Sequence, residues 1–301
     1  MSPEKPKAGP SYVEFVVLVS MMMALVALSI DAMLPALPHI GSDLHVRNAN
    51  DRQLVISAIF LGLAFGQLFF GPLSDRTGRK PAVYAGYSLF IAGSLLAISA
   101  ASFPILLVGR LLQGVGMSAP RGVSLALVRD RHVGREMARV MSFVMTVFIL
   151  VPMIAPLTGQ GILIFAGWRS IFGGLVVFAL VTFVWFAMRM PETLAPENRV
   201  PFSLHHIISA TREILGIRTA VGYTVTAGLV SGLFIGYLNS AQQVFQEQYA
   251  LVPFHRTDLG FIPAQAQSVT GRFLPISAFS SASHGLAPSI GKRQISRVKQ
   301  H

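Results

Sequence analysis

Apolar residues along this chain fall into seven long blocks separated by short polar segments. Each block is close to the ~20 residues that a helix needs to span a hydrocarbon core of about 30 Å. The blocks cover residues 15–37, 54–73, 81–101, 105–128, 140–165, 171–188 and 220–238. None alternates between apolar and polar residues as a barrel strand does, and backbone groups in lipid must be satisfied within their own segment. The pattern therefore predicts an all-α membrane protein.

The composition agrees with a membrane-embedded chain. Hydrophobic residues make up 52% of the sequence and charged residues 12%, against roughly 25% charged in an ordinary soluble domain. The chain has no cysteine, which excludes a disulfide framework, a thiolate metal site and a thiol nucleophile.

Basic residues are distributed unevenly between alternate loops. The outer loops would hold only Arg47, Arg52 and Arg169 if the N-terminus lies inside. The inner segments would then hold thirteen: Lys5, Lys7, Arg76, Arg79, Lys80, Arg129, Arg131, Arg135, Arg139, Arg189, Arg199, Arg212 and Arg218. Since short cytoplasmic loops carry the excess of Lys and Arg, this asymmetry predicts a multi-pass protein of the cell inner membrane with a cytoplasmic N-terminus.

The formal net charge of +11 raises the question of a nucleic-acid partner. Most of this charge lies in loops next to lipid, where it reports topology and attraction to anionic headgroups. The sequence has no RNA-binding signature and no zinc spacing. We therefore expect contact with the lipid bilayer and no nucleic-acid partner.

The chain divides into five segments by the same pattern. We expect a cytoplasmic N-terminus (1–14), a six-helix half (15–188), a cytoplasmic linker with a helix on the membrane surface (189–219), a seventh transmembrane helix (220–250) and an irregular tail (251–301). The tail loses helical periodicity abruptly and contains four prolines. It is interpreted as aberrant, as translation in a shifted frame would produce, or else as a disordered outer tail.

Three ionisable residues lie well inside predicted spans: Asp31, Arg110 and Arg121. Each costs about 2.5 to 3.5 kcal/mol at a helix centre, so we expect each to face a cavity or another polar group rather than lipid. Arg110 and Arg121 are eleven residues apart, which places them within about 20° on one helix face and roughly 16 Å apart along the axis. Gln113 flanks the same stripe.

Asp31 has two interpretations. In the functional one it is a protonatable switch, because Pro35 and Pro38 follow it and loosen the helix enough to admit water. In the structural one it forms a static ion pair with an arginine and holds two helices together. We favour the switch.

The segment from Gly71 to Pro81 is a charged turn between two spans. Gly71 and Pro72 are predicted to end the second span, and Gly78 to permit a tight reversal. Arg76, Arg79 and Lys80 should hold the loop inside. Asp75 needs a basic or helix-N-terminal partner.

The fifth span contains Pro152 and Pro156, followed by Gly159. Each proline removes a backbone hydrogen bond, and a glycine lets a neighbouring helix approach closely. The pattern fits both a functional bend and ordinary packing. Nothing in the sequence indicates a metal site, a cofactor or a catalytic nucleophile, so we expect a protein that is not an enzyme.

Five motifs in order resemble those of the major facilitator superfamily. Gly71 to Pro81 resembles the signature between its second and third helices. The other four are Asp31-Ala-Met-Leu-Pro-Ala-Leu-Pro38, Gly109-Arg-Leu-Leu-Gln-Gly-Val-Gly116, Trp168-Arg-Ser-Ile-Phe172 and Pro191-Glu-Thr-Leu194. The similarity runs from Tyr12 to Ala250 and is strongest to bacterial drug/proton antiporters of the bicyclomycin and chloramphenicol-resistance type.

The resemblance implies a transporter that exports hydrophobic drug-like molecules in exchange for protons. On the family's pattern Asp31 is a proton or substrate carboxylate, Arg110 lies near the proton path, and Asp75 belongs to an inner gate. The fifth-helix motif departs from the pattern, because Ala155-Pro-Leu-Thr-Gly-Gln160 stands where Gly-Pro-x-x-Gly-Gly is expected. The alternatives are a related carrier of a metabolite or sugar, and a non-transporting fragment that associates with another half-transporter.

Members of the family have twelve spans in two six-helix halves, whereas this chain supplies the first half and one more helix. A central cavity needs both halves. We therefore expect that the chain on its own does not transport.

Overall fold

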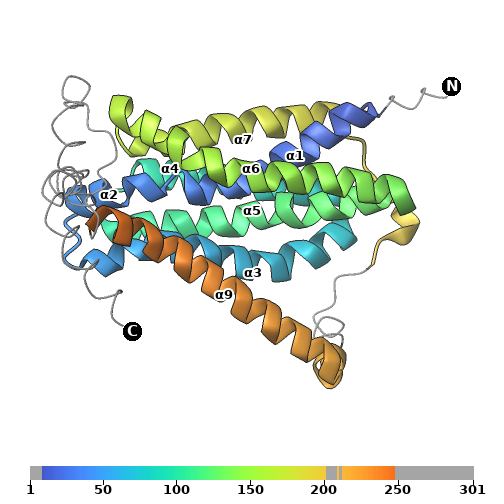
Figure 1. The fold of residues 1–301 in the computed structure, drawn as a ribbon. Coiled ribbons are helices and arrows are strands. Elements are labelled where there is room, and N and C mark those ends of the chain that lie inside the picture. The colour runs from blue at the N-terminus through green and yellow to red at the C-terminus, as the bar shows by residue number, and fades with distance from the viewer. Residues whose placement is uncertain (1–8, 201–208, 210–211, 248–301) are drawn as a thin grey trace, which may run out of the picture. The chain divides into compact units, whose positions relative to one another are not determined.

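The computed structural model describes residues 9–200, 209 and 212–247 of the chain. Its long helices are α1 (Tyr12–Asp31), α3 (Leu54–Thr77), α4 (Arg79–Ile98), α5 (Phe103–Arg131), α6 (Gly134–Ala166), α7 (Arg169–Arg189) and α9 (Arg218–Glu247) (Figure 1). Short elements are η1 (Leu34–Ala36), α2 (Leu37–Asp43), η2 (Ala49–Gln53) and η3 (Pro196–Asn198). Every predicted span overlaps a long helix, and no strand occurs in the described ranges. The all-α prediction is confirmed.

Five of these stretches are long and apolar enough to cross a membrane: Tyr12–Asp43, Asn50–Thr77, Arg79–Ile98, Gly134–Ala166 and Arg169–Arg189. Helix α5 has 29 residues but is not among the five because polar side chains interrupt it. Arg110 and Gln113 of α5 are fully buried among neighbouring helices. The polar side chains of α5 that face neighbouring helices make this helix less apolar than the other spans.

The first predicted span is broken in the structure. Helix α1 starts with a capping box in which the Ser11 hydroxyl accepts the Glu14 N–H at 3.3 Å, and it ends at Asp31. The 3-10 turn η1 and the short helix α2 follow. Pro35 and Pro38 lie within the first two positions of these elements, where a missing N–H costs no internal bond.

The second span does not end at Gly71 and Pro72, so that prediction was wrong. Helix α3 continues through Pro72 to Thr77. The Thr77 hydroxyl donates to the Leu73 carbonyl at 2.8 Å within this last turn. The reversal occurs at Gly78, whose φ of 105° is open to glycine but rare for other residues, so the predicted role of Gly78 is confirmed.

Glycines bring the backbones of α3, α4 and α5 into contact. A side chain at Gly62 of α3 would meet the Leu111 carbonyl of α5, and one at Gly114 of α5 would meet the Ile59 carbonyl of α3. A side chain at Gly93 of α4 would meet the Gln113 backbone nitrogen of α5. Such small-residue contacts are the usual way in which membrane helices pack tightly.

Two predicted segments fall largely outside the described residues. The linker's surface helix was predicted from residues 202–215, most of which are not described. The irregular tail at 251–301 is not described either.

Candidate functional site

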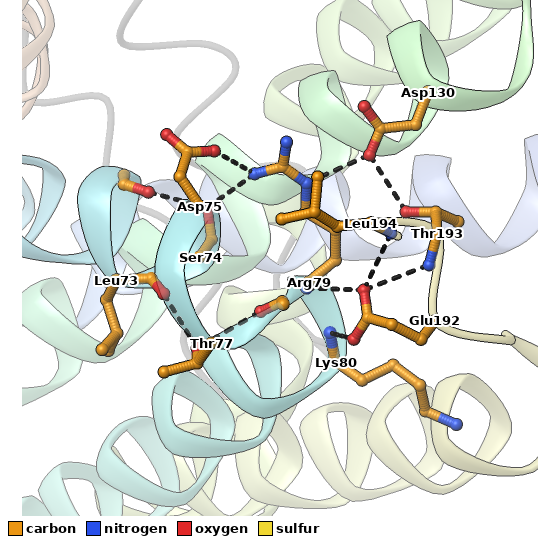
Figure 2. Close-up of polar contacts among 12 residues, drawn as sticks. Leu73, Ser74, Asp75, Thr77, Arg79, Lys80, Asp130, Glu192, Thr193 and Leu194 are labelled. Atoms are coloured by element: carbon orange, nitrogen blue, oxygen red, sulfur yellow. Dashed lines mark hydrogen bonds and ion pairs between the residues drawn. The ribbon is translucent and has the colours of Figure 1, made fainter. Parts of the chain in front are cut away.

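Arg79 joins three helices at the α3–α4 turn. Its Nη1 lies 2.5 Å from Asp75 Oδ1 and donates to the Ser74 hydroxyl at 2.9 Å, both in α3. Its Nε lies 3.0 Å from Asp130 Oδ2 in α5. The Arg79 side chain is 10% exposed, so both carboxylates pair with a largely buried cation. Figure 2 shows the guanidinium between the two acids.

Glu192 completes this network from the far end of α7. Its carboxylate accepts the backbone N–H of Arg79 at 2.8 Å and of Lys80 at 3.0 Å, which are the first two residues of α4 (Figure 2). It also accepts the N–H of Thr193 and of Leu194, each at 3.1 Å. The first amides of a helix have no partner inside it and carry partial positive charge, so a carboxylate there is stabilising.

Thr193 links the two parts of the network. Its hydroxyl donates to Asp130 Oδ2 at 3.0 Å, the same oxygen that contacts Arg79. Polar contacts therefore connect the ends of α3 and α5 and the segment after α7 with the start of α4. We call Asp75, Arg79, Asp130, Glu192 and Thr193 the turn network.

The predicted gate residues divide into two groups. Asp75 has the basic partner that the sequence required, and Gly78 makes the reversal. Lys80 lies near the network and donates through Nζ to the Ala187 carbonyl at 3.2 Å. Gly71 and Arg76 are exposed, and neither joins the turn network.

A cavity of about 260 Å³ lies beside the network between α3 and α5. Its walls include Asp75, Arg79, Ser118, Arg129 and Asp130. Two basic and two acidic side chains thus line it, so the cavity is polar without a strong excess of either charge.

Arg110 forms the second polar centre, inside the helical bundle. It is fully buried, and its Nε donates to the Val55 carbonyl of α3 at 3.1 Å. Its Nη1 donates to the Ser29 carbonyl of α1 at 3.0 Å and to Gln113 Oε1 at 3.1 Å. Ser29 lies in the last turn of α1, where carbonyls lack helical partners.

Gln113 extends this centre to α4. Its Nε2 donates to the Ser94 hydroxyl at 2.7 Å, and that hydroxyl donates to the Phe90 carbonyl at 2.8 Å. The Arg110 guanidinium also lies 5.7 Å from the Phe172 ring of α7. One arginine thus contacts α1, α3 and α7 and, through Gln113, reaches α4.

Asp31 is buried, with 6% of its surface exposed, at the last residue of α1. Among the described residues no basic side chain comes within salt-bridge distance of its carboxylate. The static Asp–Arg pair is therefore absent from the described residues, and the protonatable switch stays a prediction. Arg110 is held by backbone carbonyls instead, although one of them belongs to Ser29, two residues before Asp31.

Arg121 lies partly buried on α5 and, within the part of the chain that the structure covers, pairs with no carboxylate. Of the two cations in the predicted stripe, Arg110 is fully buried and has three hydrogen-bond acceptors. Arg121 has no carboxylate partner among the described residues.

Gly159 of the predicted antiporter helix packs against the break that follows α1. A side chain at Gly159 would meet the Ala32 carbonyl, one residue after Asp31. Pro152 and Pro156 lie inside α6, which is continuous from Gly134 to Ala166. The structure thus brings this motif next to Asp31, while a functional bend stays a prediction.

Sequence reasoning missed three members of the turn network: Asp130, Glu192 and Thr193. The Pro191-Glu-Thr-Leu194 motif was the available signal for two of them, but nothing in it indicates that Glu192 caps a helix that starts 113 residues earlier. No group of three His, Cys, Asp or Glu side chains suited to a metal ion occurs in the described ranges.

These features define a helical membrane protein whose charged groups lie at a helix turn and inside the bundle. The profile of the Major Facilitator Superfamily matches residues 19–297, and the chain belongs to this family. The family consists of transporters, so the chain is a member of a transporter family and not an enzyme.

Curated relatives match between 64% and 78% of the chain. An uncharacterized MFS-type transporter of Bacillus subtilis (strain 168), YdgK, is 35% identical over 238 residues, which is 78% of this chain and 59% of that protein. A Bicyclomycin resistance protein homolog of Haemophilus influenzae is 32% identical over 77% of this chain and 58% of its own length. Multidrug resistance protein MdtL of Klebsiella pneumoniae is 33% identical over 64% and 52%. The chain spans less than two thirds of each relative.

Solved structures share the fold. A human organic anion transporter, MFSD10 (TETRAN), superposes with a TM-score of 0.53 at 19% identity, over 66% of this chain and 53% of that one. A D-xylose-proton symporter gives a TM-score of 0.52 at 15% identity, over 81% and 61%. At these identities the likeness concerns the fold alone.

Proposed function

We propose that residues 15–188 form the N-terminal half of a proton-driven exporter of hydrophobic drug-like molecules in a bacterial inner membrane, with the N-terminus in the cytoplasm. The observation that carries the proposal is Asp31, a buried acid at a helix break with no basic partner among the described residues. A carboxyl group in such a place can take up and release a proton without first breaking an ion pair.

The named relatives support the drug class. One is a bicyclomycin resistance protein homolog and several are multidrug resistance proteins. The xylose-proton symporter and the peptide transporters resemble the chain in fold only, so a metabolite or sugar carrier has no specific observation in its favour.

In the proposed mechanism Arg110 is a positioning residue. It holds the Ser29 carbonyl, so the end of α1 cannot unwind past this point without breaking a hydrogen bond from a charged donor. Proton uptake by Asp31 changes the charge just beyond that fixed point. The flexible part is then the stretch formed by Asp31, η1 and α2, against which Gly159 of α6 packs.

The proposal is tested by drug export from an efflux-deficient bacterium. The chain is produced alone and as a chimaera in which its residues 12–250 replace the matching part of the Bacillus subtilis relative. We expect the chimaera to expel a fluorescent hydrophobic cation in a manner that a proton ionophore abolishes. The chain alone should expel none, because a central cavity needs both halves.

Asp31→Asn keeps the size of the side chain but cannot bind the proton, so the chimaera should lose export while its amount in the membrane is unchanged. Asp51→Asn, a half-exposed acid in η2 outside the long helices, is the matched control. Export that survives Asp31→Asn, or that ignores the ionophore, would refute proton coupling at this residue.

A further inference from the structure

An apolar groove runs along α1 between α6 and α7, away from both polar centres. Its volume is about 660 Å³. Lining residues include Tyr12, Val16 and Leu28 of α1, Phe143 and Ile154 of α6, and Phe178 of α7. From Tyr12 to Leu28 the groove follows α1 for about 24 Å, more than the ~15 Å that one leaflet contributes to the hydrocarbon core.

Helices α1 and α6 meet at a glycine at one end, and large side chains line the groove at the other. Gly159 lets the backbones meet at Ala32, as described above. Towards the start of the two helices, Phe143 and Val147 of α6 line the groove instead of a glycine. Large side chains thus line this end of the groove, whereas glycines close the contact between α3 and α5.

Both helices start at the same end of the bundle. The Tyr12 ring lies 5.8 Å from the ring of His132, which stands two residues before α6. Counting back twenty residues from Ala32 and from Gly159 reaches Tyr12 and Arg139, so Arg139 lies level with the groove's mouth. It is also one turn before Phe143, on the same face of α6.

The mouth of the groove carries an excess of positive charge. Arg139 is exposed and makes no hydrogen bond or ion pair with any described residue. Of the nearby carboxylates, Glu14 contacts Arg189 at 2.5 Å, and Glu136 is 79% exposed and lies 3.7 Å from His132 Nδ1. Residues 131–139 carry three arginines, at 131, 135 and 139, against this one acid. An apolar channel that ends at a free guanidinium matches a molecule with a long hydrocarbon chain and an anionic head.

We propose that this groove binds an anionic phospholipid of the leaflet in which α1 begins, with an acyl chain between α1, α6 and α7 and the phosphate against Arg139. Two lining residues are polar. Thr146 donates its hydroxyl to the Ser142 carbonyl at 2.8 Å, and Ser20 brings a buried hydroxyl that has no partner among the described residues. The remaining lining is hydrocarbon or aromatic, as an acyl chain requires.

The test is native mass spectrometry of the full chain, purified and delipidated in detergent, with dioleoyl phosphatidylglycerol or dioleoyl phosphatidylcholine added. We expect phosphatidylglycerol to bind more tightly. Arg139→Gln should reduce that preference by about fivefold, the effect of one basic residue at a charged lipid surface, while Arg139→Lys should retain most of it. Arg47→Gln, an exposed arginine outside the groove, is the matched control and should change nothing.

A second pair of variants tests the groove itself. Val17→Trp fills it from its rim and should weaken both lipids, whereas Val177→Trp, on an exposed position of α7 outside the lining, should weaken neither. Circular dichroism verifies that each variant keeps its helices.

Three results would overturn the proposal. Equal binding of the two lipids in both wild type and Arg139→Gln would remove the role of the headgroup. Binding of soluble glycerophosphoglycerol as tight as that of the lipid would point to a simple anion site. Displacement of the lipid by ethidium in the wild type but not in Val17→Trp would make the groove a site for the transported drug.

Discussion

Glu192 and Arg79 are 113 residues apart in the chain, and the carboxylate of the first accepts the backbone N–H of the second at 2.8 Å. This contact fixes the segment after α7 to the first residue of α4. The same carboxylate accepts three further backbone amides, so a single side chain organises both a helix start and the turn that leads away from α7.

Glu192→Gln is expected to lower the free energy of unfolding by about 1 to 2 kcal/mol, because the negative charge at the start of α4 is lost. The new amide NH2 group would also face backbone N–H groups, which are donors themselves and which the Glu192 carboxylate accepts. Thermal unfolding in detergent, followed by fluorescence-detected size-exclusion chromatography, measures the change. Glu197→Gln, an exposed acid in η3, should leave the midpoint unaltered, and equal midpoints for the two variants would contradict the role of Glu192.

Arg110→Gln is expected to destabilise the protein by about 3 kcal/mol, since hydrogen bonds from a charged donor are worth more than neutral ones. Three acceptors lose their donor: the carbonyls of Ser29 and Val55, and Gln113 Oε1. Arg110→Lys should rescue little, because an ammonium group lacks the planar fork that reaches all three.

Arg121→Gln provides the comparison on the same helix. It removes an arginine that has no carboxylate partner in the described part of the chain, so the unfolding midpoint should hardly move. A midpoint for Arg110→Lys equal to that of the wild type would show that the buried fork is not needed.

Gly62→Ala is expected to cost about 1 to 3 kcal/mol, the usual range for overpacking, because the added methyl group meets the Leu111 carbonyl. Backbone cannot rotate away as a side chain can, so α3 and α5 must separate. Gly122→Ala in α5 has no neighbouring atom within 4 Å and should be neutral or slightly stabilising. Should both variants unfold at the same temperature, the α3–α5 contact is looser than described.

The orientation can be measured directly because the chain has no cysteine. Single cysteines placed as Asn48→Cys and Glu197→Cys lie on exposed positions in segments expected on opposite sides of the membrane. With a cytoplasmic N-terminus, a membrane-impermeant maleimide added to intact cells should label the first and not the second. The reverse pattern would overturn the orientation inferred from basic residues.

The sequence was sufficient to locate the helices because each is a long apolar block, and block length depends on local composition alone. It was less reliable at their ends. Proline at position 72 suggested a helix end, yet α3 continues to Thr77, whose hydroxyl donates to the Leu73 carbonyl in the last turn. The reversal was correctly placed at Gly78, where a positive φ is a requirement of the residue itself.

The polar partners were harder to predict than the polar residues. Arg110 was expected inside the bundle, and it is buried there. Its main acceptors, however, are backbone carbonyls, and every residue has one, so the sequence holds no signal for which carbonyl is chosen. For Asp31, a basic partner was one of the two interpretations of the sequence. The structure shows no basic side chain paired with it among the described residues.

Arg110 is bonded to the end of α1 and the start of α3 while belonging to α5. Three helices pinned at one point resist sliding past each other. Any large motion of this unit must then take place as rocking of a rigid body, with deformation confined to segments outside the pin, such as the turn after Asp31. The buried guanidinium of Arg110 would in this way determine which segments move as one rigid body and which segments deform.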